Sequence, residues 1–228
     1  MTSLSLPTLA KAESACTVSD KPCVMKQIEM TAQQIEDKSW RDKVYRELAK
    51  SYASENMTDK AIALIAQIET PDTKAMTIRG IGMAAADLKW ADKTKYDSLF
   101  TTLKGEAVKI THPPSNAIAY TYIAMAQAFA GDDKGAMATA LGMENPALKH
   151  KALAETAEIQ AERGDLTQAL KSIEAIDSVA FKNKAYATVA HIFTKQGQLD
   201  EAYQSAMKIE NAYKKTEALQ DIINHDSK

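Results

Sequence analysis

Small and apolar residues recur along this chain with a period of 33 residues. In the C-terminal half, an alanine stands five residues after a glycine in three successive copies, and we call these anchors: Ala136, Ala169 and Ala202. An apolar residue follows each anchor by seven positions: Met143, Ile176 and Ile209. A second alanine precedes each anchor by twelve positions: Ala124, Ala157 and Ala190. A period of this length holds two amphipathic helices, so the pattern predicts a repeat of antiparallel helix pairs.

The turn between the two helices carries a glycine in the three strong copies: Gly131, Gly164 and Gly197. Glycine takes the left-handed backbone conformation without the penalty that a Cβ brings, so it ends one helix and lets the next begin. Asn56 holds this place in a weaker copy, and asparagine is the next most tolerant residue there. The alignment gives six anchor positions: Ile28, Ala61, Leu103, Ala136, Ala169 and Ala202.

One interval between anchors breaks the period. Ala61 and Leu103 are 42 residues apart, which places a nine-residue insertion near residues 88–102. Because a helix rises about 1.5 Å per residue, this hairpin is expected to be longer than its neighbours and to project past the rim of the repeat. Its aromatic residues need a surface to pack on, and they are candidates for a lid: Trp90, Tyr96 and Phe100.

The two-helix unit, the small residues at helix crossings, the Gly-Asp turn and the early alanine of the second helix resemble the tetratricopeptide-repeat family. A proline near the end of some units agrees with this: Pro71, Pro113 and Pro146. The resemblance spans about residues 24–224. Two features depart from the family: the unit is one residue shorter than the usual 34, and the bulky aromatic residue expected four residues after the anchor is replaced by Ile65, Ala140, Ile173 or Ala206.

This resemblance implies an all-α fold. We expect a right-handed α-solenoid of about six antiparallel helix pairs, in which each unit packs mainly on its neighbours. A closing helix over residues 212–224 has polar residues on its outer face, as the end of such an array requires. The expected repeat domain covers residues 24–228.

Residues 1–23 do not share the repeat and are interpreted as an N-terminal extension. They hold both cysteines of the chain, Cys16 and Cys23. A close pair in a chain otherwise free of cysteine is typical of a local disulfide formed in an oxidising compartment, and the alternative is two free thiols in a tail. Leu4 to Leu9, followed by Ala10-Lys11-Ala12 with small residues at the two positions that a signal peptidase reads, is similar to the end of a secretory signal. The expected location is therefore periplasmic or otherwise exported.

The overall charge balance excludes one class of partner. Lys and Arg total 28 against 30 Asp and Glu, for a formal net charge of −2. Nucleic-acid binding depends on clustered Lys and Arg, and here these residues are spread along predicted helix faces, so no nucleic-acid partner is expected. No apolar run reaches the length of about 18 residues that a membrane-spanning helix needs, so no transmembrane segment is expected.

The residue patterns of catalysis and metal binding are absent from the sequence. The four histidines are isolated, and neither cysteine belongs to a zinc pattern. The segment GIGMAA at 80–85 matches a dinucleotide-binding motif, but no strand is predicted before it and it continues the helix register of the preceding unit. Glu155, Glu158 and Glu162 form an acidic stripe, and His191 lies one period after Glu158, so this carboxylate and imidazole could be neighbours. Such a pair is interpreted as a surface contact rather than as an acid and base. The protein is therefore predicted to be non-enzymatic, with no cofactor and no metal.

The first helix of each pair is expected to line a concave groove. Register from the anchors predicts that the ends of this groove are charged and that its middle is apolar and rich in methionine. The predicted ligand-binding groove consists of Met76, Arg79, Met83, Ile118, Tyr122, Met125 and Phe129. Methionine side chains adapt to ligands of irregular shape, and Arg79 would bind a carboxylate or hydroxyl of the ligand. The alternative is that these side chains bury one another.

Two functions fit such a groove. The first is a scaffold or adaptor that takes an apolar segment of a partner protein, in an envelope complex of a bacterium. The alternative is a carrier or acceptor of an apolar small molecule, lipid or sterol-like, in periplasmic lipid transport. The resemblance to tetratricopeptide proteins favours the first, and the methionine-lined middle favours the second. The central positions Gly80, Ile118 and Tyr122 lack the cationic and amide groups with which some tetratricopeptide domains hold acidic peptide tails.

Overall fold

The computed structural model describes residues 16–225, and the regular structure in this range is entirely helical, with thirteen helices and no strand. The expected all-α class is therefore confirmed. The helices are α1 (Lys21–Ala32), α2 (Lys38–Ser54), α3 (Thr58–Gln67), α4 (Pro71–Ala84), α5 (Leu88–Ala91), α6 (Lys93–Val108), α7 (Pro113–Phe129), α8 (Asp133–Leu141), α9 (Pro146–Glu162), α10 (Leu166–Glu174), α11 (Val179–Lys195), α12 (Leu199–Met207) and α13 (Ala212–Ile223).

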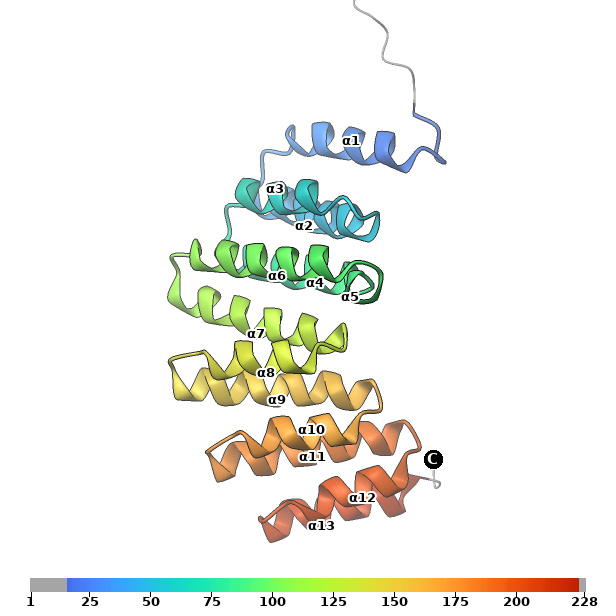
Figure 1. Cartoon of the computed structure of the whole chain (residues 1–228), viewed down its shortest axis with the longest axis vertical. Coiled ribbons are helices and arrows are strands. Elements are labelled where there is room, and N and C mark those ends of the chain that lie inside the picture. Colours follow the sequence, from blue (N-terminus) through green and yellow to red (C-terminus); the bar gives the residue numbers. More distant parts are fainter. Residues whose placement is uncertain (1–15, 226–228) are drawn as a thin grey trace, which may run out of the picture.

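The helices follow one another along the long axis of the molecule, from α1 at one end to α13 at the other (Figure 1). The longer helices α2, α4, α7, α9 and α11 each lie against the next member of this set, and α11 lies against α13. The shorter helices α3, α8, α10 and α12 each pack on the longer helix that precedes them. Buried side chains therefore form a core that continues from pair to pair, and its two main clusters meet at α7.

Positive φ marks the turns that the sequence pattern predicted. Among the described residues, the glycines with positive φ are Gly131, Gly164 and Gly197, at 76°, 80° and 73°. Asn56 is the non-glycine residue with positive φ, at 58°. These four residues join the two helices of a pair, so the prediction of the turns is confirmed.

The anchor residues form the centre of the stack, with one exception. Ala61, Leu103, Ala136, Ala169 and Ala202 are all fully buried. Ile28, the first predicted anchor, is 40% exposed. It lies on α1, at the end of the described stack, where α2 is the neighbour that covers this helix. The prediction of a buried anchor at Ile28 is therefore wrong.

The predicted insertion forms α5 and the long helix α6. Tyr96 and Phe100 of α6 are 2% and 3% exposed, and their ring centroids lie 4.5 Å apart within the main hydrophobic core. The prediction that these two aromatics form a lid is wrong, because side chains that fill the core are not free to close over a groove. Trp90 of α5 is 77% exposed, so for this residue the lid stays a prediction.

The segment GIGMAA belongs to helix α4 rather than to a strand and loop. A Cβ on Gly82 would lie 2.8 Å from the Cβ of Ala126 on α7, so glycine allows these two helices to approach closely. This packing role explains the glycine without any nucleotide.

The N-terminal cysteines are joined to each other. Cys16 and Cys23 form a disulfide with Cα atoms 5.7 Å apart, and it closes the loop that leads into α1. Helix α1 begins at Lys21, ahead of the expected domain boundary after residue 23. The predicted signal remnant over residues 4–12 lies outside the described residues. Within the described range, no helix has the length and apolar character needed to cross a bilayer.

Candidate binding face on helices α4 and α7

The residues predicted to line the groove lie on two helices that pack directly against each other. Met76, Arg79 and Met83 belong to α4, and the other four belong to α7. Met76 and Phe129 are exposed, at 37% and 46%. Arg79, Met83, Ile118 and Tyr122 are half-buried, and the last three of these pack against the core. We call these six residues the α4–α7 face.

Met125 does not belong to this face. It is only 8% exposed and packs in a small cluster with Ala128, Ala136 and Ile159. The prediction of Met125 as a ligand-binding residue is therefore wrong. The register from the anchors placed it on the inner side of α7, but α8 and α9 cover it there.

Arg79 is the charged residue within the α4–α7 face. Its guanidinium carbon lies 5.4 Å from the centroid of the Tyr122 ring, in a cation–π arrangement. Its Nε is buried and has no hydrogen-bond partner among the described residues, and no carboxylate there forms an ion pair with it. Because the half-buried guanidinium forms no ion pair with a described residue, Arg79 has the capacity to bind one acidic group.

Basic side chains border the α4–α7 face on the side of α2. Arg46 donates a hydrogen bond to Glu47 at 2.8 Å, and Lys50 donates one to the same carboxylate at 2.8 Å. These hydrogen bonds, that of Lys50 most of all, lower the pKa of the Glu47 carboxyl. Arg46 Nη1 also lies 3.7 Å from the sulfur of Met76. One carboxylate thus faces two cations here, which leaves this border positive.

Acidic side chains border the face on the side of α9. Glu155, Glu158 and Glu162 stand on α9, one period after Tyr122, Met125 and Phe129 of α7. Burial raises the pKa of the Glu158 carboxyl, and the neighbouring charges of Glu155 and Glu162 raise it further. Glu158 and His191, the pair interpreted as a surface contact, form no ion pair among the described residues, and His191 Nδ1 lies 2.7 Å from Asp221 Oδ2 of α13. This border is therefore negative.

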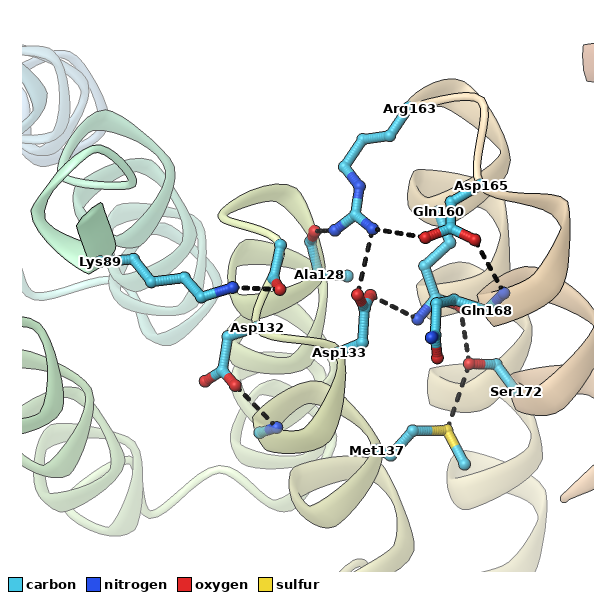
Figure 2. Close-up of polar contacts among 12 residues, drawn as sticks. Lys89, Ala128, Asp132, Asp133, Met137, Gln160, Arg163, Asp165, Gln168 and Ser172 are labelled. Carbon is cyan, nitrogen blue, oxygen red and sulfur yellow. Dashed lines mark hydrogen bonds and ion pairs between the residues drawn. The ribbon is translucent and has the colours of Figure 1, made fainter. Parts of the chain in front are cut away.

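A polar network around the turn between α7 and α8 holds α7, α8, α9 and α10 together (Figure 2). Arg163 donates to the carbonyl of Ala128 and also lies 3.1 Å from Asp133 Oδ2. Gln160 donates to the other oxygen of Asp133 at 2.8 Å and accepts from Ser172 at 2.7 Å. On the other side, Lys89 donates to the carbonyl of Gly131. These contacts fix the turn that follows Phe129.

Sequence reasoning missed this network, although it has a periodic signal. Gln127 and Gln160 are 33 residues apart, and so are their hydroxyl partners Thr139 and Ser172. Thr139 donates to Gln127 at 2.6 Å in the same way that Ser172 donates to Gln160. An amide and a hydroxyl that recur at the same positions of successive units would have predicted the hydrogen bond between them.

The described residues contain no group of three or more acidic, histidine or cysteine side chains arranged to hold a metal ion. A cavity of about 630 Å³ lies elsewhere, between α6, α7, α8 and the start of α9, and none of the α4–α7 face residues lines it. The α4–α7 face is a half-exposed surface with oppositely charged borders, and its cation, Arg79, has no ion-pair partner within residues 16–225.

No family model matches this chain, and no curated protein matches it. Among solved structures, the crystal structure of Ton1535 from Thermococcus onnurineus NA1 is similar at 15% sequence identity, over 91% of this chain and 86% of that chain, with a TM-score of 0.32. A likeness this distant carries no argument about function, so the residues of this chain have to supply it.

Proposed function

We propose that this chain is a non-enzymatic binding protein, a scaffold or adaptor that holds a segment of a partner protein on its α4–α7 face. In this proposal the stacked helix pairs form a right-handed α-solenoid of tetratricopeptide-like repeats. The observation that carries the proposal is Arg79, a cation set among apolar side chains without an acidic partner in the described residues. An unpaired charge in such a setting costs stability and is useful when a partner supplies the opposite charge.

The borders of the face define the chemistry of the partner segment. Its apolar side chains would rest on Met76, Tyr122 and Phe129, and methionine adapts to their shape. An acidic residue would pair with Arg79, near the positive border of α2. A basic residue would face the negative border of α9, where it would relieve the repulsion within the acidic stripe. The proposed partner is therefore an amphipathic segment with an acidic end and a basic end.

The disulfide supports an exported location. Disulfides persist in oxidising compartments such as the bacterial periplasm and are rare in the cytosol. The bond between Cys16 and Cys23 is thus consistent with a protein that works in an envelope complex.

A lipid or sterol-like molecule is the second candidate occupant, because Met83 and Phe129 offer apolar surface without hydrogen-bonding demands. Bound lipids usually occupy a cleft that buries most of their surface. The α4–α7 face lines none of the larger cavities of the described chain, which favours the protein segment over the lipid.

Site-specific photo-crosslinking tests the proposal. A photoreactive amino acid at Met76 or Phe129, in protein expressed in its own host, is expected to trap one partner at a single segment. The matched control is the same amino acid at Tyr213, which is 73% exposed on α13, far from the face. Arg79→Glu should abolish the crosslink, and the trapped segment should carry both an acidic and an apolar residue.

A synthetic peptide of the trapped segment should bind the purified protein, and its binding should be lost when its acidic residue is replaced. Equal crosslinking from Tyr213, or a crosslink that Arg79→Glu leaves unchanged, would contradict the proposal. Native mass spectrometry of the same preparation, with a recurring bound lipid in place of a trapped segment, would decide for the carrier.

A further inference from the structure

The cavity between α6, α7, α8 and the start of α9 exposes a position that is closed in the other units. Tyr120 of α7 lines this cavity and is half-buried. The residues in the same register of the other units are buried to 6% exposure or less: Tyr45, Ile78, Leu153 and Tyr186. The cavity is thus a local opening of the repeat core, next to the insertion that lengthens α6.

A second periodic position also changes at this cavity. The residue seven positions after each anchor is isoleucine in five units and methionine in one, Met143, which lines the cavity. Methionine is unbranched and flexible, so it tolerates an irregular neighbour better than the β-branched isoleucine does. Leu148 of α9 adds a further apolar side chain to the lining.

Two of the five units in this register fill this part of the repeat with an oxygen acceptor. Asp42 of α2 is fully buried, and its carboxylate accepts hydrogen bonds from the backbone N–H groups of Glu69 and Thr70, at 3.1 and 2.8 Å. Near the other end of the chain, the amide oxygen of Asn183 accepts from Glu210 at 2.7 Å and from Asn211 at 3.3 Å. An oxygen thus satisfies two adjacent N–H groups just before the next helix.

The cavity has the same pair of donors but no such oxygen. Ala117 of α7 stands in the register of Asp42, and the matching donors are the backbone N–H groups of Glu144 and Asn145. Neither donates to a protein acceptor within residues 16–225. The backbone of Asn145, with φ −75° and ψ 118°, is the same as that of Thr70, with φ −74° and ψ 119°. The Asn145 N–H thus has the same local backbone conformation as the Thr70 N–H, which donates to the Asp42 carboxylate.

The position of Ala117 differs from the other positions of its register in two respects, its place beside the cavity and a nearby positive charge. The residues of that register are Asp42, Ala75, Ala117, His150 and Asn183, and of these Ala117 lines the cavity. Lys104 of α6 lines it as well and forms no ion pair with another described residue. The negative charge of Glu144 would oppose the binding of an anion, but this side chain is exposed to solvent. The group of Glu144 that is relevant to the cavity is its backbone N–H.

We propose that this cavity binds an amphipathic carboxylate. The carboxylate of the ligand takes the place of the Asp42 carboxylate, accepts from the N–H groups of Glu144 and Asn145, and is neutralised by Lys104. Its apolar part rests on Tyr120, Met143 and Leu148. A volume of about 630 Å³ is in the range of small-ligand sites. The ligand is a free acid or the carboxyl terminus of a peptide, which share this chemistry.

This site is independent of the proposed partner site. Tyr120 and Tyr122 are two positions apart on α7, so their side chains point about 200° apart around the helix axis. Loss of binding at the cavity therefore leaves the crosslinking experiment on the α4–α7 face unaffected, and the two proposals fail separately.

Amide NMR titration of the full chain tests the inference. The probes are N-acetyl-leucine and octanoate, with N-acetyl-leucinamide and octanamide as matched neutral controls. Both acids share the proposed chemistry, so at least one of them should shift the backbone amide signals of Glu144 and Asn145, and the neutral amides should not. A preference for N-acetyl-leucine indicates a peptide terminus, and a preference for octanoate indicates a free fatty acid.

Variants separate a specific site from a general charge effect. Ala117→Asp and Ala117→Asn place an internal oxygen on the two N–H groups, as Asp42 and Asn183 do, and should abolish the shifts while the fold is kept. Lys104→Gln should weaken binding about fivefold, Glu144→Gln should strengthen it, and the control Lys109→Gln on the same helix should have no effect.

The inference is overturned if neither acid shifts these two amide signals at about 10 mM, or if the neutral amides shift them equally. It is also overturned if Ala117→Asn binds the acids as well as the unchanged protein does.

Discussion

The Asp42 carboxylate accepts a hydrogen bond of 2.8 Å from the backbone N–H of Thr70, 28 residues further along the chain. Asp42 is fully buried on α2, and it also accepts from the N–H of Glu69. Through these two bonds it joins the first helix of one unit to the start of the next. Asn183 makes the same connection to Glu210 and Asn211 near the other end of the stack.

Replacing Asp42 by alanine should destabilise the N-terminal part of the stack. The substitution removes two hydrogen bonds to a charged acceptor, from the N–H groups of Glu69 and Thr70, at a cost of about 2 to 3 kcal/mol in the free energy of unfolding. Asp42→Asn keeps one acceptor oxygen, as Asn183 does, and should cost less than half as much. Urea unfolding followed by circular dichroism measures both differences.

Asp87→Ala is the matched control for the Asp42 substitutions, because the Asp87 side chain is exposed and makes no side-chain cap. It should leave the urea midpoint nearly unchanged. If Asp42→Ala behaves like this control, the carboxylate does not hold the loop in solution.

Loss of the charged side chain should lower the stability of the protein at Arg163 but not at Arg79. Arg163 donates to the carbonyl of Ala128 and pairs with Asp133 and Asp165, so Arg163→Met should lower the free energy of unfolding by about 2 kcal/mol. Arg79 has a buried Nε without a partner, so Arg79→Met should leave stability unchanged or raise it. Thermal unfolding of the two variants side by side makes the comparison.

This pair of variants also bears on the proposed function. A residue that lowers the stability of the folded protein is expected at positions where binding requires that residue. If Arg79→Met proves as destabilising as Arg163→Met, Arg79 has a structural role and the case for an acidic partner group is lost.

Much of the fold was predictable from the sequence because one period fixes both helices and turns. Positive φ at Gly131 and Asn56 followed from glycine and asparagine at equivalent positions. The region of the expected insertion holds the short helix α5 and the 16-residue helix α6, and the burial of Tyr96 there was not foreseen. Within a regular array, periodicity indicates which side of a helix a residue occupies. Residues of an insertion, such as Tyr96, have no equivalent in the other units, so their burial cannot be predicted in this way.

The candidate site was only partly predictable. Register placed Met76 and Phe129 on a surface, and it misassigned Met125, because register alone does not show where the following helices α8 and α9 cover α7. The donors facing Ala117 were not foreseen at all. In the sequence they are marked only by an alanine, Ala117, at the position where other units have Asp42 and Asn183. This difference can be interpreted only when the hydrogen bonds of Asp42 and Asn183 are known.

Glu158 should make stability depend on pH. Its pKa is raised in the folded protein, first by burial and then by the charges of Glu155 and Glu162, while Lys184 acts in the opposite direction. The unfolded chain therefore loses this proton at a lower pH than the folded chain, so the folded state loses stability as the pH rises above the usual carboxyl pKa of about 4.3.

Glu158→Gln should accordingly raise the free energy of unfolding at pH 7, and this gain should disappear below about pH 4. Urea unfolding at a series of pH values measures it. Glu217→Gln, at an exposed position on α13, is the control and should show no such gain. A Glu158→Gln protein that is less stable than the unchanged protein at pH 7 would show that the carboxylate is satisfied where it stands.

Two glycines should give opposite results when replaced by alanine. Gly105 lies within α6, and a Cβ added there meets no atom within 4 Å, so Gly105→Ala should raise the free energy of unfolding by about 0.5 to 1 kcal/mol through helix propensity and a less flexible unfolded chain. Gly131 has a φ of 76° in the turn between α7 and α8, so Gly131→Ala should lower it by about 1 kcal/mol or more. Thermal unfolding under identical conditions measures both. A gain in stability from Gly131→Ala would mean that the turn adopts another conformation in solution, because an alanine cannot improve a left-handed turn.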